Sequence, residues 1–286
     1  MFIMISRKFN NYPIKTISKN IEEALKPYNK LIEKGVKWVS KQDKEDIYIK
    51  SFDDLSLHAI FIEKKNAKGV FIEVHGYRSV ASRDIYPSCY HYYDMGYSLL
   101  IIDQRTSNKS EGKYLTFGIN ESKDIISWIK YINNRFNKLP IVLAGVSMGA
   151  STIMLSADKI KPTMNVKAIL ADCGFVSPSE EIKYALKHFF HVNGSIFIFM
   201  INIWCKLIGK FDIYSNNTID SLKNIKIPLL LVHGKDDDLI PSYNSINNYE
   251  SYEGIKKLVL FDNASHGMSY LVDSKKYIKS IKDIIG

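Results

Sequence analysis

The sequence of 286 residues predicts an α/β fold, with a mostly parallel central sheet and helices on both faces. Short, almost wholly apolar runs recur after Gly69, which is typical of strands that a parallel sheet buries on both faces. Segments with helical spacing of apolar residues separate these runs, which indicates crossover connections between parallel strands. The interval from Asp172 to Pro228 is much longer than a simple crossover requires, and it indicates an insertion.

The chain begins with a segment that we expect to form a helical extension over residues 1–44. Within it, "SKNIEEALKPYNKLIEKGVKWV" carries apolar residues at helical spacing on both sides of Pro27. The next stretches, "DIYIKS" and "LHAIFIE", alternate apolar and polar residues around the turn "FDDLS". This alternation predicts an antiparallel hairpin at the start of a main domain covering 45–286.

The strands and helices of this main domain follow in alternation. Six strands are expected after the hairpin, at 70–76, 98–103, 141–146, 166–172, 228–234 and 257–262. Helices are expected roughly at 82–95, 120–136, 148–159, 242–250 and 272–284. The carboxyl ends of such strands form the edge at which open α/β sheets bind ligands.

The insertion, at about 175–225, is expected to be a helical cap over that edge. It contains the longest apolar run of the chain, 195–209, which is interrupted by Asn202 and Lys206 and is too short to span a membrane. Three interpretations of this run remain open: it lines a pocket, packs internally or touches a membrane surface.

Composition argues against several classes of protein. The net charge is +9, from 39 basic and 30 acidic residues, but the lysines are scattered and no dense basic run is interleaved with aromatics. This favours a solvated surface, with weak attraction to anionic membranes left open, over a nucleic-acid partner. The three cysteines are widely spaced and match neither a disulfide framework nor a metal-ligand pattern. Since the apolar start before Arg7 is also too short for a signal-peptide core, we expect a soluble cytoplasmic protein.

A candidate nucleophile stands in "IVLAGVSMGASTIM". Ser147 follows a buried strand and precedes a helix, with Gly145 and Gly149 two residues to either side. This strand–turn–helix context is that of a nucleophile elbow, in which a sharp turn exposes the hydroxyl at the edge of the sheet. A Cβ atom at either glycine would clash with the neighbouring backbone, and the following helix directs its amino end toward the serine.

A serine hydroxyl needs a base, and the base needs an orienting acid. His266 lies among small residues in "FDNASHGMS", just after the last expected strand, and is the candidate base. His75 and His233 are interpreted as structural. The acid is left open by spacing alone, and the candidates are Asp236, Asp237 and Asp238, with Asp172 as a rival and Asp262 as a third possibility.

An oxyanion hole for acyl transfer needs two backbone N–H groups. One is expected from Met148, the residue after the nucleophile. The other is expected from Tyr77, because Gly76 permits a tight turn in the loop "EVHGYRS" after an earlier strand.

These motifs together make the chain resemble the α/β-hydrolase superfamily, over roughly residues 45–286. The segments that carry the resemblance are "VHGYRS", "GVSMGA", "HGKDDDLIP" and "SHG". The chain is most similar to bacterial members of the serine-aminopeptidase and monoacylglycerol-lipase-like branch. The resemblance implies that the acid is Asp237. The segment "DQRTSNKSEGKYLTFG" departs from the family pattern, because Thr106, Ser107 and Asn108 stand where Gly, His and Gly are usual.

The function implied is that of a serine hydrolase, carboxylesterase-like or lipase-like, acting on small to medium acyl esters without a metal or organic cofactor. An aminopeptidase or amidase is an alternative, and it would need Glu180 or Glu181 of the cap to hold a substrate amine. A non-catalytic protein that binds a small molecule is a further alternative, but such a protein has no need for an intact Ser, His and Asp set. The oligomeric state stays open.

Overall fold

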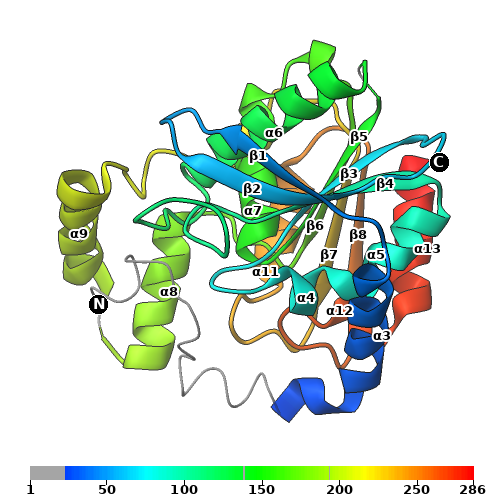
Figure 1. Cartoon of the computed structure of the whole chain (residues 1–286). Helices are drawn as coiled ribbons and strands as arrows, with labels where there is room; N and C mark the ends of the chain where they lie inside the picture. Colours follow the sequence, from blue (N-terminus) through cyan, green and yellow to red (C-terminus); the bar gives the residue numbers. More distant parts are fainter. Residues whose placement is uncertain (1–22, 138, 193) are drawn as a thin grey trace.

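The computed structural model describes residues 23–137, 139–192 and 194–286. The strands in this part of the chain form one eight-stranded sheet (Figure 1). The strand order is β1-β2-β4-β3-β5-β6-β7-β8, and only the pairs β1–β2 and β2–β4 are antiparallel. The strands are β1 (Glu45–Lys50), β2 (Ser56–Ile62), β3 (Gly69–Val74), β4 (Tyr97–Ile102), β5 (Ile141–Val146), β6 (Val166–Asp172), β7 (Leu229–Gly234) and β8 (Lys256–Phe261). The expected mostly parallel sheet is therefore confirmed.

The helices agree with the sequence prediction, except that the helices expected at 82–95 and 148–159 each divide into two. The helices outside the cap are η1 (Lys26–Tyr28), α3 (Asn29–Ser40), α4 (Ala81–Asp84), α5 (Tyr86–Asp94), α6 (Glu121–Arg135), α7 (Met148–Leu155), η2 (Ala157–Lys159), η3 (Pro162–Met164), α10 (Thr218–Leu222), α11 (Tyr243–Ser251), α12 (Ser269–Val272) and α13 (Ser274–Ile285). The helix expected at 82–95 breaks at Ile85, because Pro87 in the first turn of α5 has no N–H to continue the earlier helix.

Both faces of the sheet are covered, as expected of an α/β fold. In β3, Val70 and Val74 belong to the core layer that α6 and α7 cover, while Phe71 faces the layer of α5 and α13. This alternation follows from the period of two along a strand. Helix α3 packs against α5, and its Val39 joins the second layer (Figure 1). Residues 1–22 of the expected extension lie outside the described part of the chain.

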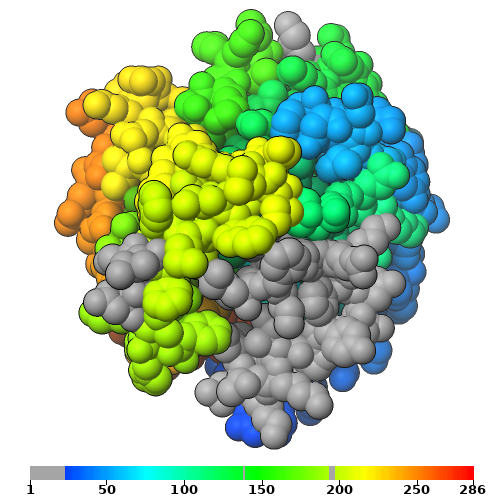
Figure 2. All heavy atoms as spheres, turned by 90° about the vertical axis from the view of Figure 1, so that its left-hand side faces the viewer, coloured from blue at the N-terminus to red at the C-terminus, as the bar shows by residue number. Residues whose placement is uncertain are grey.

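The segment between β6 and β7, where a cap is predicted at about 175–225, contains α8 (Pro178–Phe190), α9 (Gly194–Trp204), the π-helical turn η4 (Cys205–Gly209) and α10. The first three of these are called the cap below. The cap lies on the face of the molecule shown in Figure 2, near the blue β1–β2 hairpin. The inner side of α9 is apolar, and Ile198 and Ile201 join a cluster that includes Met148. Its outer side exposes further apolar residues, among them Phe199 and Trp204. None of the described helices has the length and apolarity needed to cross a membrane.

Candidate active site

Ser147 occupies the sharp turn between β5 and α7, with an unusual backbone φ of 57°. Its N–H donates to the carbonyl oxygen of Asp172 at 2.8 Å, which fixes the turn against the neighbouring strand β6. The two flanking positions require glycine because a side chain at either one would clash with neighbouring backbone. A Cβ atom on Gly149 would lie 2.2 Å from the carbonyl oxygen of Val74, and one on Gly145 would lie 2.6 Å from the backbone of Gly149. Only glycine allows the helix to approach the strands so closely.

His266 lies between Ser147 and Asp237. Its Nε2 is 2.8 Å from the Ser147 hydroxyl oxygen, and its Nδ1 is 2.8 Å from Oδ2 of Asp237. With Nδ1 protonated, the ring donates to Asp237 and accepts the serine O–H, which is the tautomer that base catalysis needs. The loops after β5, β7 and β8 supply the three side chains at one edge of the sheet. Hydrogen bonds thus join His266 to Ser147, which lies 119 residues earlier in the chain, and to Asp237, which lies 29 residues earlier.

Asp237 is distinguished from the other candidate acids by its surroundings. Its Oδ1 accepts the N–H groups of Leu239 and Ile240 at 3.1 and 2.9 Å, and its side chain is fully buried. The other four candidate acids are not hydrogen-bonded to His266. Asp236 and Asp238 are exposed. Asp172 accepts a hydrogen bond from the Ser269 hydroxyl, and Asp262 forms an ion pair with Lys235. Of the acids that spacing left open, the structure brings Asp237 to the imidazole.

The electrostatics of the pair favour an ionised acid beside a strongly basic imidazole. Burial alone would raise the pKa of Asp237, but His266 and His233 outweigh it and hold that pKa below its ordinary value. Burial works to lower the pKa of His266, but Cys173 and Asp237 raise it well above the ordinary value. The carboxylate can therefore stabilise an imidazolium that forms when His266 takes a proton.

The loop expected to complete the oxyanion hole runs beside the nucleophile. A Cβ atom on Gly76 would lie 3.2 Å from Cβ of Ser147, so the backbone entering Tyr77 is close to the serine. Asp84, which the sequence analysis did not identify, accepts the Gly76 N–H at 2.9 Å. Arg83 in turn binds Asp84 and the Ser79 hydroxyl, at 2.9 and 2.8 Å. No sequence signal marked this support, because it depends on how α4 docks on the loop.

The two histidines interpreted as structural are held mainly by partners outside the triad, although Nε2 of His233 also lies 3.2 Å from Oδ2 of Asp237. Nε2 of His75 accepts the Gln104 N–H at 3.2 Å, and the Gln104 amide donates to the His75 carbonyl at 2.6 Å. His233 is fully buried between the Ser245 hydroxyl and the Ile240 carbonyl, both at 2.7 Å. These contacts hold the ends of β3 and β7, from which the site loops begin.

An apolar cluster and one acidic side chain lie near the site. The rings of Tyr77 and Phe117 stack with centroids 5.5 Å apart. Phe117 belongs to the buried cluster that contains Met148 and cap residue Ile182, and Tyr77 packs against that cluster. Glu181 of α8 interacts electrostatically with His266 and Asp237, and burial raises its pKa to about 8. Glu180, the other acid considered in the sequence, is exposed.

Comparison with curated proteins finds relatives of undescribed activity, and no protein-family model matches the sequence. The chain is 28% identical to the uncharacterized protein YqkD of Bacillus subtilis (strain 168) over 193 residues. The match covers 67% of this chain and 63% of YqkD, which is less than two thirds of that relative. It is also 23% identical to the uncharacterized protein R595 of Acanthamoeba polyphaga mimivirus, over 90% of this chain and 86% of R595.

Solved structures give a clearer likeness. The esterase Pf2001 of Pyrococcus furiosus matches with a TM-score of 0.68 at 21% identity, over 86% of this chain and 94% of the esterase. Est1E of Butyrivibrio proteoclasticus, determined with ferulic acid bound, matches with a TM-score of 0.60 at 19% identity, over 84% and 98% of the two chains. An alpha-beta serine hydrolase homologue of Coxiella burnetii matches with a TM-score of 0.58 at 17% identity, over 82% and 95%.

At these identities the likeness is one of architecture. The chain shares the fold of the proteins just named, whereas the expected branch of relatives stays a prediction. The protein has the α/β-hydrolase fold.

Proposed function

We propose that this protein is a serine hydrolase that cleaves carboxylic esters of small to medium acyl chains, as a carboxylesterase or lipase-like enzyme does. The observation that carries the proposal is the pair of 2.8 Å hydrogen bonds linking Ser147, His266 and Asp237. A serine hydroxyl held by a base, which is held by a carboxylate, is an activated nucleophile. The neighbour Pf2001 is named an esterase, which agrees with this reaction type.

In the first half-reaction, Ser147 Oγ attacks the ester carbonyl while His266 Nε2 takes the hydroxyl proton. Asp237 stays ionised and stabilises the imidazolium. The tetrahedral intermediate then collapses, the bond to the alkoxy oxygen breaks, and His266 returns the proton to the leaving alcohol. In the second half-reaction, water activated by His266 hydrolyses the acyl-enzyme, so that the acid is released and Ser147 is restored.

The oxyanion of the intermediate is assigned to the backbone N–H groups of Met148 and Tyr77. Support for Met148 comes from its position at the start of α7, directly after the nucleophile. Support for Tyr77 comes from the closeness of Gly76 to Ser147 and from the Asp84 hydrogen bond that holds this loop.

The acyl chain is assigned to the apolar wall formed by Tyr77, Phe117 and the inner side of the cap. Burial of a methylene group there is worth about 0.8 kcal/mol, so the preferred chain length reports how far the wall extends. We also infer a cytoplasmic location, because the three cysteines are buried free thiols. A small-molecule ester or amide is the proposed partner.

An aminopeptidase or amidase is a second candidate, and Glu181 favours it. Glu181 is half-buried near the triad, and burial raises its pKa to about 8 although the charge of His266 lowers it. A substrate ammonium group would further stabilise the ionised carboxylate. Glu181→Gln should then reduce cleavage of aminoacyl-naphthylamides about tenfold or more and leave p-nitrophenyl ester hydrolysis much less affected. Equal effects on both substrates would remove this candidate.

Labelling with a fluorophosphonate probe tests the serine-hydrolase proposal directly. Wild-type protein should be labelled and Ser147→Ala should not, whereas Ser110→Ala, a serine away from the site, should be labelled like wild type. A screen of p-nitrophenyl esters of graded chain length then defines the acyl preference. Equal labelling of wild type and Ser147→Ala would overturn the proposal, and a folded wild type that is not labelled would favour the non-catalytic binding protein.

A further inference from the structure

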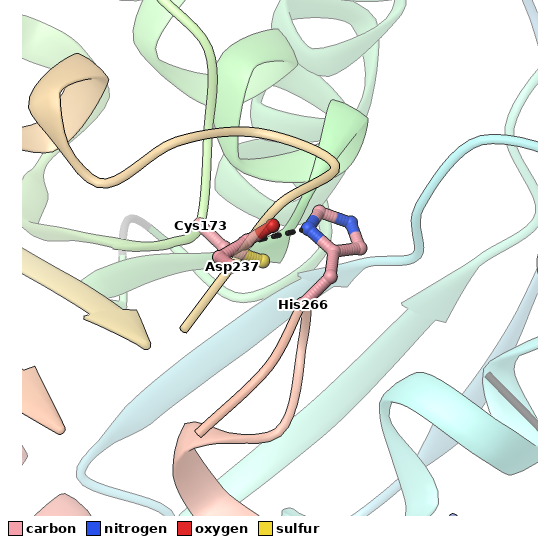
Figure 3. A group of neighbouring side chains, drawn as sticks. All are labelled: Cys173, Asp237 and His266. Carbon is pink, nitrogen blue, oxygen red and sulfur yellow. Dashed lines mark hydrogen bonds and ion pairs between the residues drawn. The ribbon is translucent and has the colours of Figure 1, made fainter. Parts of the chain in front are cut away.

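Cys173 lies beside the catalytic pair, although the proposed reaction does not use its thiol. Cys173 follows β6, Asp237 follows β7 and His266 follows β8, so three neighbouring parallel strands bring the side chains together. Figure 3 shows the Cys173 sulfur next to the Asp237 carboxylate, with the His266 ring turned toward that carboxylate. Within the described ranges, one ligand atom from each of these residues lies within 4.8 Å of the other two.

The three donors are those that zinc-like cations prefer. Thiolate sulfur, imidazole nitrogen and carboxylate oxygen are the usual protein ligands of Zn²⁺, and an open zinc site has three such ligands plus water. Around a tetrahedral ion the donor atoms stand about 3.5 Å apart. Nδ1 and Oδ2, now 2.8 Å apart, would therefore open by less than ~1 Å, while the sulfur, which lies within 4.8 Å of both partners, would approach by about 1 Å at most. A thiolate and a carboxylate also balance the double positive charge, which makes burial of the ion tolerable.

The backbone directs the thiol toward this position. Cys173 has a φ of 49°, and its N–H donates to the Val232 carbonyl at 2.9 Å. The residue is fully buried, while the His266 side chain retains 13% exposure and borders the solvent-accessible side of the cluster. His266 is therefore the least buried member of the group.

We propose that Cys173, Asp237 and His266 form an inhibitory binding site for a thiophilic divalent cation such as Zn²⁺ or Cd²⁺. The ligand atoms are Cys173 Sγ, an Asp237 carboxylate oxygen and His266 Nδ1, with water in the fourth position. Binding displaces the thiol proton and the Nδ1 proton, and both leave to solvent. The ion then occupies the place of the hydrogen bond between His266 and Asp237.

This occupation stops the base from working. A dication on Nδ1 opposes protonation of Nε2 by Coulomb repulsion, so the ring no longer takes the proton of Ser147. Asp237 is also diverted from stabilising an imidazolium. The inhibition rests on the proposed hydrolase function, whereas the metal binding does not.

Cadmium titration followed by ultraviolet absorption tests the binding alone, because a cadmium–thiolate bond produces a charge-transfer band. Chelator-treated wild type should show the band with one Cd²⁺ per chain by equilibrium dialysis. Cys173→Ser should lose the band and bind Cd²⁺ at least about tenfold more weakly. Cys89→Ser is the matched control, since Cys89 is buried beside the Glu73 carboxyl but belongs to no such three-donor group among the described residues.

An unchanged band in Cys173→Ser, or a wild type that gives no band, would overturn the site whatever the enzyme activity. The second measurement is ester hydrolysis with and without ZnCl₂, expressed for each variant as a ratio to its own metal-free rate. Wild type and Cys89→Ser should be inhibited and recover with EDTA, and Cys173→Ser should need at least about tenfold more zinc. Equal sensitivity of all three would contradict inhibition through this site, and a wild type that binds Cd²⁺ without hydrolysing any ester would count against the hydrolase alone.

Discussion

Besides Ser147, His266 and Asp237, the described part of the chain contains a serine, histidine and aspartate cluster around His58, and the two clusters are arranged for different roles. In the first, His266 divides its two nitrogens between Asp237 and the Ser147 hydroxyl. In the second, His58 of β2 directs both nitrogens to carboxylates, Nδ1 to Asp103 and Nε2 to Asp46, each at 2.6 Å.

The serine of the second cluster, Ser110, forms its hydrogen bonds with backbone groups. The Ser110 hydroxyl accepts the backbone N–H of His58 at 2.8 Å and donates to the backbone carbonyl of Asp103 at 2.6 Å. It is therefore not hydrogen-bonded to the imidazole. The His58 side chain is 1% exposed, against 13% for His266. The difference teaches that residue types do not make a triad: one imidazole nitrogen must be left for a hydroxyl that substrate can reach.

The largest expected effect is the loss of catalytic activity when the first cluster loses its histidine. Loss of the base in His266→Ala should lower kcat/KM for a p-nitrophenyl ester by about 10⁴-fold or more, because the nucleophile is no longer activated. Thermal unfolding should change less than the activity, since the buried Asp237 carboxylate keeps the N–H groups of Leu239 and Ile240 as donors. Steady-state kinetics and melting curves on the same preparation measure both quantities. Retention of more than a tenth of the activity would remove His266 as the base.

His58→Ala should lower the stability of the protein and leave its reactivity unchanged. This variant leaves the buried Asp103 carboxylate without its main partner, which should cost roughly 2–4 kcal/mol of unfolding free energy. Fluorophosphonate labelling per folded molecule should stay near the wild-type level. Urea denaturation gives the first quantity and labelling of the folded fraction the second. A folded His58→Ala that is not labelled would show that the two clusters are coupled.

A smaller effect is expected for Ser110→Ala. Two buried hydrogen bonds to the backbone are lost, which should cost about 1–2 kcal/mol of stability. The kinetic constants should be unchanged, in contrast to Ser147→Ala. Denaturation midpoints and kcat/KM measured side by side check this, and a drop in kcat/KM without a drop in stability would speak against the structural role.

The smallest effect, for Asp46→Asn, depends on pH. Hydrogen bonds from Lys109 and then His58 lower the pKa of Asp46 below its ordinary 3.8, so the ionised form stabilises the native state above that pH. This contribution disappears as the pH falls through the folded-state pKa, because the carboxyl becomes protonated in both states. Asp46→Asn should therefore be slightly less stable than wild type at pH 7, and the difference should shrink as the pH falls below 3.8. A difference that grows on acidification would contradict this assignment.

Much of this arrangement could be read from the chain itself. The apolar runs located all six strands of the parallel part, because burial on both faces demands continuous apolar residues. The glycines beside Ser147 indicated a close approach of backbone, and the chain order of serine, acid and histidine named His266. Local boundaries were less certain. The break at Ile85 depends on Pro87, and the cap was located by its length rather than by its packing.

The sequence by itself determined the layer architecture and the loops that carry the nucleophile and the base, because periodicity and turn chemistry are local properties. Tertiary structure alone decided which aspartate meets His266, why His58 and Ser110 form a structural cluster, and that Cys173 lies beside the triad. Those outcomes depend on contacts between strand ends far apart in the chain. Strand register and loop docking set such distances, and no local pattern of residues encodes them.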